Sequence, residues 1–263
     1  MKLTALPCLC ADVFDGTEEI RTGGEAMNFA VHAAKFRGID VALVGIIGKD
    51  RFGEAILEAI SDKKIEKHIR IDEQRVTANN RIYLTESGDR YFKENSWNGE
   101  ILDDFTLNAE EIALISQSDA VFVHFWASCF REIVELKKKF GFKLAVDFDV
   151  YRDFADMEKF APFIDFFMIS GEEDLLHYFR EFSEKYGSLF NMSLGENGSV
   201  TYFNGEEYRV KAKPVSQVVD TTGCGDSYHA GFVCSYLLYG DIEKAMTAGS
   251  ELAAETLSHY GGF

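Results

Sequence analysis

The sequence predicts an α/β protein, in which helices cover both faces of a mostly parallel central sheet. Short apolar runs alternate with longer segments of helical periodicity along most of the chain, as in a parallel sheet built with crossover helices. The 263 residues, of which 46% are hydrophobic, are also sufficient to bury a substantial core. We therefore expect one domain over residues 1–263, with three layers in the order α/β/α.

The elements can be assigned in order along the chain. Residues 3–14 predict the first strand, and residues 24–38 predict a helix that ends at Gly38. Asn204 and Gly205 form a typical hairpin turn. Further strands are expected at 40–48, 119–125, 142–149, 163–170 and 189–195, with a hairpin over 198–210, and further helices at 52–63, 129–141, 172–187, 225–239 and 241–259.

One segment departs from this alternation. Residues 66–92 indicate successive strands without an intervening helix, with a turn at Ser87-Gly88-Asp89. We expect a small β lid, formed by about 12–22 and 66–96, to fold out from the main sheet. Such an appendage can cover a site at the sheet edge or form an oligomer contact, and both alternatives remain open.

Charge and cysteine content exclude several classes of protein. A formal net charge of -17 argues against a nucleic-acid partner and against docking on anionic membranes. The five cysteines form no metal-binding spacing, and their odd number indicates free thiols in a reducing cytosol. No segment is long and apolar enough to predict a membrane span. We expect a cytoplasmic protein.

The stretch "DTTGCGDSYHAGF", residues 220–232, places small residues and one carboxylate before an apolar helical run. Ligands of parallel α/β sheets bind where strands lead into helices, and a glycine-rich turn at a helix N-terminus can hold phosphate. Asp226 could then take a proton from an attacking hydroxyl. The alternative is a tight turn at Gly223 and Gly225, with Asp226 serving only to cap the helix.

This corner resembles the C-terminal signature of the ribokinase-like (PfkB) carbohydrate kinases, Asp-Thr-x-Gly-Ala-Gly-Asp, with Cys224 in the alanine position. Three further motifs of that family follow in the correct order: Gly23 and Gly24 with Asn28, "GIIGKDRFG" at 45–53, and "SLGENGS" at 193–199. Within the family, "CADVF", "HFW" and "LSHYGGF" are similar to fructoselysine 6-kinases.

The resemblance implies a ribokinase-like fold and an ATP-dependent kinase that phosphorylates a primary hydroxyl, with fructoselysine or a related sugar–amine adduct as acceptor. Asp226 would be the catalytic base, and backbone N–H groups would stabilise the transferred phosphoryl group. The implied contacts are Gly223, Cys224 and Gly225 to that phosphoryl group, Asp12, Gly23, Gly24 and Asn28 to the sugar, and Ser193, Gly195, Gly198 and Thr222 to the nucleotide.

The cofactors implied are ATP and Mg²⁺, with Glu173 helping to organise the metal. The asparagine that normally precedes this glutamate is missing from Ser170-Gly171-Glu172-Glu173, and the first strand departs from the family around Pro7-Cys8. The need for K⁺ near Asp220 stays open, as does the choice between a monomer and a homodimer paired through the lid.

Candidates for acceptor specificity are Arg81 and Arg90, which could clamp a carboxylate, with Trp97, His124 and Trp126. Each has a plainer explanation: Trp126 could face the core, and the arginines could simply be solvated. Two alternative functions remain. One is a kinase for ribose, fructose, another hexose or a nucleoside; the other is a sugar- or nucleotide-binding protein without catalysis.

Overall fold

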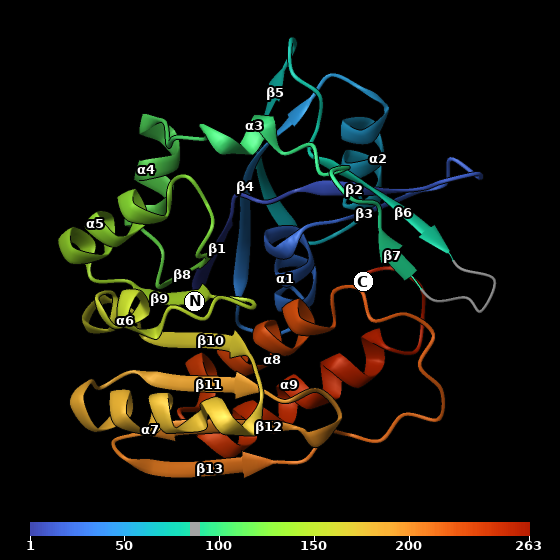
Figure 1. Ribbon diagram of the computed structural model, residues 1–263. Helices are drawn as coiled ribbons and strands as arrows, with labels where there is room; N and C mark the ends of the chain where they lie inside the picture. Colours follow the sequence, from blue (N-terminus) through green and yellow to red (C-terminus); the bar gives the residue numbers. More distant parts are fainter. Residues whose placement is uncertain (85–89) are drawn as a thin grey trace.

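The computed structural model describes residues 1–84 and 90–263, so the predicted turn at Ser87-Gly88-Asp89 lies outside the described part. Its main sheet has the order β13-β12-β11-β10-β9-β8-β1-β4-β5 (Figure 1). Neighbouring strands are parallel except at β11–β12 and β12–β13, which confirms the predicted mostly parallel sheet. The strands are β1 (Lys2–Leu6), β4 (Asp40–Gly48), β5 (Ile65–Asp72), β8 (Ala120–His124), β9 (Lys143–Asp147), β10 (Phe166–Ser170), β11 (Leu189–Ser193), β12 (Ser199–Phe203) and β13 (Glu206–Val210).

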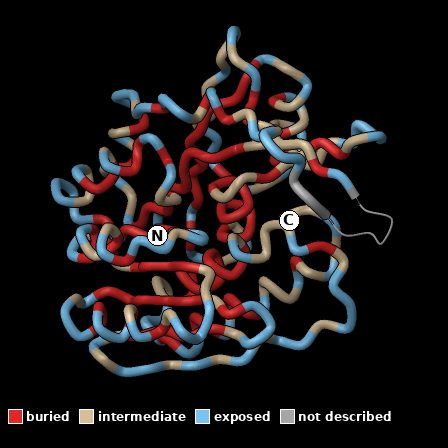
Figure 2. Tube along the Cα trace, in the orientation of Figure 1, coloured by how far each residue is buried: buried red, intermediate tan, exposed pale blue. Residues whose placement is uncertain are grey.

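Helices cover both faces of this sheet, as the sequence predicts. Side chains of a strand alternate between faces, and along β8 Phe122 packs with Phe29 and Phe232, whereas Val121 and Val123 belong to a second core cluster. Most strand residues are therefore buried (Figure 2). The core that contains Phe122 lies under α1 (Glu25–Ala33), α2 (Arg51–Ala59), α8 (Cys224–Tyr239) and α9 (Ile242–Thr256). The core that contains Val121 and Val123 lies under α3 (Glu100–Asp103), α4 (Ala109–Ser116), α5 (Phe130–Phe140), α6 (Phe154–Glu158) and α7 (Leu176–Lys185). Short 3₁₀ turns lie at Ala161–Phe163, Glu173–Leu175 and Gly195–Asn197.

A second sheet forms the predicted lid, with the order β3-β2-β6-β7. Its strands are β2 (Cys10–Phe14), β3 (Ile20–Gly23), β6 (Asn79–Leu84) and β7 (Arg90–Phe92). The sheet is not purely antiparallel, because β2 and β6 run parallel. In Figure 1 it projects from the main sheet beside α1 and α2.

Two boundaries differ from the expectation. The predicted first strand is broken at Pro7 into β1 of the main sheet and β2 of the lid, because proline cannot donate a ladder hydrogen bond. The segment expected to open the lid at residue 66 is instead β5, which pairs with β4 over its whole length as the parallel edge strand of the main sheet. The helix α2 supplies the crossover that this parallel pairing requires.

The "GIIGKDRFG" motif fixes the base of the lid. The Asp50 carboxylate caps α2 by accepting hydrogen bonds from the Phe52 and Gly53 N–H groups, both at 2.9 Å. It also accepts from the Thr77 N–H at 2.7 Å, just before β6 begins. A Cβ on Gly48 would lie 2.3 Å from the Arg75 carbonyl, so only glycine fits there. This motif therefore has a structural role.

The C-terminal residues pack against the inner elements of the fold. The His32 ring and the Gly262 carbonyl form a 2.7 Å hydrogen bond, and the Gly261 N–H donates to Asp220 at 3.0 Å. This places the tail beside the corner that the sequence singles out. Among the described residues, no helix has both the length and the apolar character needed to cross a membrane.

Candidate active site

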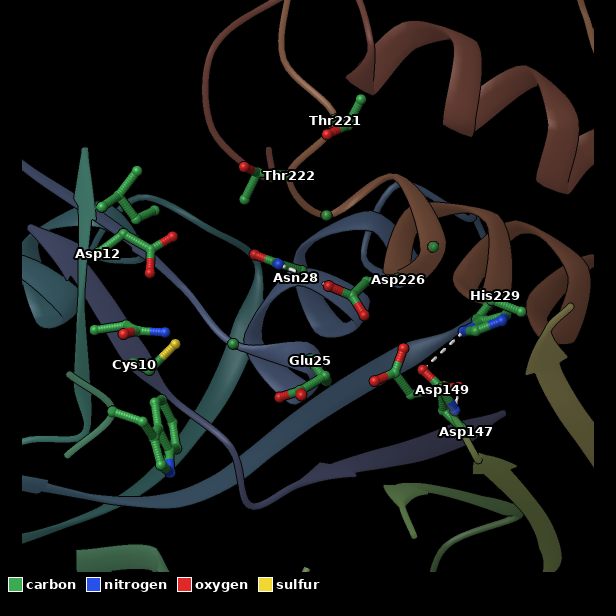
Figure 3. Close-up of a pocket in the computed structure, with 17 residues that line it drawn as sticks. Cys10, Asp12, Glu25, Asn28, Asp147, Asp149, Thr221, Thr222, Asp226 and His229 are labelled. Atoms are coloured by element: carbon green, nitrogen blue, oxygen red, sulfur yellow. Dashed lines mark hydrogen bonds and ion pairs between the residues drawn. The ribbon is translucent and has the colours of Figure 1, made fainter. Parts of the chain in front are cut away.

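A cavity of about 540 Å³ lies between the lid and the carboxyl ends of the main-sheet strands (Figure 3). Its walls come from β2 and β6 of the lid, the start of α1, the ends of β9 and β10, and the start of α8. The sheet thus opens its ligand site where parallel α/β folds usually do. The lining residues are Cys10, Asp12, Gly24, Glu25, Asn28, Asn80, Ile82, Trp97, Asp147, Asp149, Ser170, Thr221, Thr222, Gly223, Gly225, Asp226 and His229.

The glycine-rich corner forms one end of this cavity. Gly223 is the N-cap residue of α8 and has a left-handed backbone conformation, with φ at 71°. As a glycine it has no side chain that could cap the helix. The first turn of a helix leaves N–H groups without intrahelical partners, and the helix dipole makes this end attractive to anions. The Cys224 N–H donates to the Thr221 carbonyl at 3.3 Å, and its Sγ points towards Ala253 of α9. Gly223 and Gly225, which line the cavity, are the better candidates for a phosphate contact.

The Asp220 carboxylate fixes this corner through hydrogen bonds. Its Oδ1 accepts hydrogen bonds from the N–H of Thr222 at 3.0 Å and from its hydroxyl at 2.8 Å. Its Oδ2 accepts from the Gly261 N–H at 3.0 Å and lies 3.5 Å from the guanidinium of Arg21, on β3. The buried carboxylate therefore connects the corner to both the C-terminal tail and the lid.

Asp226 projects from the first turn of α8 into the cavity. Asn28 of α1 donates its Nδ2–H to the Asp226 Oδ2 at 2.7 Å. Burial, followed by the neighbouring carboxylate of Glu25, raises the pKa of Asp226 to about 8. Asp226 lies inside the helix and makes no capping bond, so the alternative of a simple helix cap is not supported. A carboxylate with a raised pKa in a cavity is suited to proton transfer near neutral pH.

Sequence reasoning missed two groups beside Asp226. Glu25, directly after the Gly23-Gly24 pair, lines the same cavity and lies near Asp226 in Figure 3. His229, whose Nδ1 is 3.3 Å from the Asp147 Oδ2, is buried one turn after Asp226. Burial alone would lower the pKa of His229, but the charge of Asp147 raises it. The i, i+3 spacing from Asp226 was a signal for His229, whereas nothing in the sequence alone placed Glu25 there.

The predicted acceptor residues divide into two groups. Asp12, Gly24 and Asn28 line the cavity, as does Trp97. Gly23 lies beside them, since a Cβ there would be 3.3 Å from Asn28 Oδ1.

The other specificity candidates lie elsewhere. Arg81 does not line the cavity, and its guanidinium pairs with Asp15 at 2.8 Å and Glu18 at 3.2 Å; the proposed clamp on a substrate carboxylate stays a prediction. Trp126 is 59% exposed, so it does not face the core, and it lines no part of this cavity. Arg90 begins β7, but its side chain lies outside what the structure describes.

The predicted nucleotide residues are more dispersed. Thr222 lines the cavity, but Ser193 is the last residue of β11, and Gly195 and Gly198 belong to the turn that follows it. The Ser193 hydroxyl lies 3.2 Å from that of Ser170, a lining residue, so this turn adjoins the cavity. We retain the nucleotide contacts as predictions.

Glu173 is not aimed at the cavity. Its two carboxylate oxygens accept hydrogen bonds from Arg209 at 2.5 and 3.1 Å, and it does not line the cavity. A metal at Glu173 would have to compete with this two-point ion pair. Oxygen donors within the cavity, among them Asp149 and Glu25, are the ligand type that Mg²⁺ prefers. The assignment of the metal to Glu173 stays a prediction.

The raised pKa of Asp226 predicts the pH dependence of catalysis. If Asp226 is the base, kcat/KM should rise with pH until about 8 and fall about tenfold per unit below it, because only the carboxylate accepts a proton. Glu25→Gln removes a neighbouring negative charge and should move this limb to lower pH. A pH profile of kcat/KM for both proteins tests this, and a limb that stays in place in the variant would contradict it.

Comparison with known proteins agrees with this geometry. A family model described as "pfkB family carbohydrate kinase" matches residues 15–262. A fructoselysine 6-kinase of Shigella flexneri is 27% identical over 258 residues, covering 97% of this chain and 96% of the relative. A fructosamine kinase of Bacillus subtilis is 25% identical over 271 residues, covering 100% of this chain and 93% of the relative.

Among solved structures, Arabidopsis thaliana ribokinase complexed with ribose and ATP superposes with a TM-score of 0.84. The two chains are 18% identical, and the match covers 98% of this chain and 93% of the other. The adenosine kinase of Sinorhizobium meliloti superposes with a TM-score of 0.79 at 21% identity, covering 99% and 94% of the two chains. These matches confirm the predicted ribokinase-like fold.

Proposed function

The chain belongs to the pfkB family of carbohydrate kinases, and on this premise we propose that its acceptor is an amine-bearing sugar, with fructoselysine or a related adduct as the first candidate. Membership makes the protein a phosphotransferase with an alcohol group as acceptor, in a family whose kinases use ATP. The specific acceptor is our proposal. It is supported by the curated relatives named fructoselysine 6-kinase and, independently, by the charge of the cavity.

The cavity is strongly acidic. Asp12, Glu25, Asp149 and Asp226 all line it, whereas the only basic lining residue in the described part of the chain is His229, which is paired with Asp147. Several carboxylates around one cavity attract a cationic ligand and raise each other's pKa values. An acceptor that carries an ammonium group would relieve this repulsion, whereas a neutral pentose would not. This is the observation that carries the proposal.

In the proposed mechanism, the acceptor hydroxyl lies against Asp226, which removes its proton as the oxygen attacks the γ-phosphoryl group of ATP. Asn28 orients the base through its 2.7 Å hydrogen bond. The N–H groups at Gly223 and Gly225 would stabilise charge that develops on the transferred group. Mg²⁺, bound with ATP, would neutralise phosphate charge next to these carboxylates. Asp12 and Asn80 of the lid, together with Trp97 in the segment after β7, would cover the sugar.

Carboxylate recognition is the part of a fructoselysine assignment that the cavity supports least. Arg81 is engaged by Asp15 and Glu18, and no arginine or lysine is among the described lining residues. We therefore propose that the amine of the adduct, rather than an amino-acid carboxylate, is the group that is recognised. Trp97, which is 52% exposed at the cavity, offers a surface for an apolar stem or for a cation–π contact.

An acceptor panel with coupled detection of ADP tests this proposal. It should include fructoselysine, a fructose adduct of a simple alkylamine without a carboxylate, ribose, fructose and a nucleoside. We expect both amine adducts to exceed the neutral sugars in kcat/KM, and the loss of the carboxylate to cost less than tenfold. Higher turnover with ribose, fructose or the nucleoside would overturn the proposal.

Glu25→Gln tests whether Glu25 is the residue that recognises the ammonium group of the acceptor. The variant should raise KM for both amine adducts by about tenfold, the value of one partly solvated charge pair, and should change KM for fructose much less. Glu58→Gln, on the exposed face of α2, removes the same charge away from the cavity and serves as the control. An equal rise in KM for charged and neutral acceptors would show that Glu25 does not recognise the amine.

Several expectations remain part of the proposal. A K⁺ ion beside Asp220, a homodimer through the lid and a cytoplasmic location are predictions. The acceptor panel run with and without K⁺, and sedimentation of the purified protein, test the first two.

A further inference from the structure

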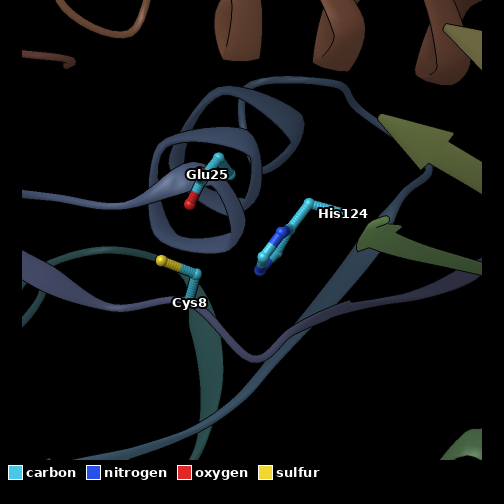
Figure 4. A group of neighbouring side chains, drawn as sticks. All are labelled: Cys8, Glu25 and His124. Atoms are coloured by element: carbon cyan, nitrogen blue, oxygen red, sulfur yellow. The ribbon is translucent and has the colours of Figure 1, made fainter. Parts of the chain in front are cut away.

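Three potential metal ligands meet beside the acceptor cavity. The Cys8 thiol, a carboxylate oxygen of Glu25 and a ring nitrogen of His124 all lie within 4.8 Å of one another (Figure 4). They come from three separate elements: the segment between β1 and β2, the first residue of α1, and the last residue of β8. Chain segments far apart in sequence therefore converge on one point.

The backbone around Gly24 explains this convergence. Gly24 has φ at 102°, and a Cβ there would lie 2.6 Å from the Cys8 carbonyl oxygen. Only glycine allows the start of α1 to approach the Cys8–Cys10 segment so closely. This approach brings Glu25 next to the Cys8 thiol, which contacts both Glu25 and the thiol of Cys10. In a parallel sheet, β8 then presents His124 at the same edge.

One polar atom of this group of side chains is buried. The Nδ1 atom of His124 is buried and has no hydrogen-bond partner among the residues that the structure describes, although His124 is only half-buried overall. A buried polar atom that is left unpaired destabilises the folded state. Cys8 is 3% exposed, so its thiol too is shielded from bulk water. A bound cation would be coordinated by a ring nitrogen of the imidazole and would supply a counter-charge for Glu25.

The donor set selects the kind of cation. We propose that Cys8, Glu25 and His124 form a binding site for Zn²⁺ or a similar divalent transition metal. A thiolate and an imidazole favour such ions, whereas Mg²⁺ prefers oxygen donors alone. Ligands about 2.0–2.3 Å from a tetrahedral Zn²⁺ lie roughly 3.5 Å apart, so the three side chains need to close by only about 1 Å.

The metal site would adjoin the acceptor cavity, because Glu25 lines that cavity. Binding would release the thiol proton and cancel one of the carboxylate charges that surround Asp226. Because Glu25 is also the proposed contact of the amine, a bound metal and an ammonium group would compete for it. The metal site itself can be tested whichever sugar the kinase phosphorylates.

Metal binding tests the proposal without any kinase assay. Chelator-stripped protein would be titrated with Zn²⁺ and with Co²⁺ as a spectroscopic probe, and bound metal would be measured after gel filtration. We expect one metal per chain, release of a proton on Zn²⁺ binding, and a thiolate-to-Co²⁺ charge-transfer band. Cys8→Ser should abolish the band, and Cys8→Ser, Glu25→Gln and His124→Gln should each weaken affinity by about 100-fold or more.

Matched controls make the result specific. Cys129→Ser changes another buried cysteine, and His177→Gln changes an exposed histidine; both should bind metal as the unaltered protein does. Circular dichroism shows which variants fold, and Glu25→Gln, at a half-buried position, keeps the test informative if the other two do not. The absence of bound metal, a charge-transfer band that persists in Cys8→Ser, or undiminished affinity in folded Glu25→Gln would each overturn the site.

Discussion

Asp226→Asn is expected to lower kcat by about 10³–10⁴-fold while ATP and acceptor affinities change only a few-fold. The amide cannot accept the proton of the acceptor hydroxyl, but it keeps nearly the shape of the carboxylate. Its side-chain oxygen can still accept the hydrogen bond that Asn28 donates to Asp226. Single-turnover kinetics and equilibrium binding of ATP and acceptor, measured on the same preparation, separate chemistry from affinity.

The same variant should be more stable than the unaltered protein at alkaline pH. The folded protein holds the proton of Asp226 up to about pH 8, whereas the unfolded chain loses it near the ordinary pKa of 3.8. The free energy of unfolding therefore falls as pH rises from about 4 to about 8. Asparagine has no proton to lose in this range, so the variant does not lose this stability. Because the cavity admits solvent, we expect Asp226→Asn to raise the free energy of unfolding by only about 1–2 kcal/mol above pH 8, which is a few degrees in Tm. We expect no gain near pH 4.

Asp62→Asn is the control, because Asp62 is exposed beside Lys63 and far from the cavity. It should leave kcat and the pH dependence of Tm unchanged. Activity of Asp226→Asn within tenfold of the unaltered protein would remove this residue from the role of base. A Tm that does not rise above pH 8 would show that the carboxylate is not forced to hold its proton.

Gly223→Ala is expected to reduce kcat by about 10²–10³-fold, as the loss of an anion-hole donor does in other enzymes. Gly223 has a left-handed conformation that costs a residue with a Cβ about 1–2 kcal/mol. The added Cβ would also lie 2.6 Å from the Gly262 Cα and 3.1 Å from the Asn28 Nδ2. The corner must shift, and both the N–H groups and the Asn28–Asp226 pair shift with it. Steady-state kinetics and thermal unfolding measure the two effects.

Gly240→Ala provides the matched comparison. Gly240 ends α8 in the same left-handed conformation, with φ at 66°, but a Cβ there has nothing within 4 Å. It should cost about 1 kcal/mol of stability and no activity. If the two alanine variants had the same kinetics, the position of the Gly223 backbone would be irrelevant to catalysis. If Gly240→Ala were as destabilised as Gly223→Ala, the close approach to Gly262 would carry no cost.

The architecture could be predicted from local pattern alone, apart from two boundaries and the three helices α3, α4 and α6, which the sequence analysis did not assign. Apolar periodicity sets each helix and strand, because it reflects which faces the element must bury. The same pattern could not tell that the run through Pro7 serves two sheets, or that β5 joins the main sheet and not the lid. Strand pairing depends on contacts between segments that are distant in sequence, and the local apolar pattern does not show which segments will pair.

The catalytic corner was determined by the sequence, because it is a contiguous stretch whose glycines and carboxylate act within one turn and one helix start. The opposite wall of the cavity was decided by the tertiary structure. Glu25 and Trp97 line the same cavity as Asp226, and Cys8 meets His124, only because the sheet edge, α1 and the lid converge there. The pairing of Arg81 with Asp15 and Glu18 was likewise a tertiary outcome. Charges and ligands act through distance in space, and only the packed chain sets those distances.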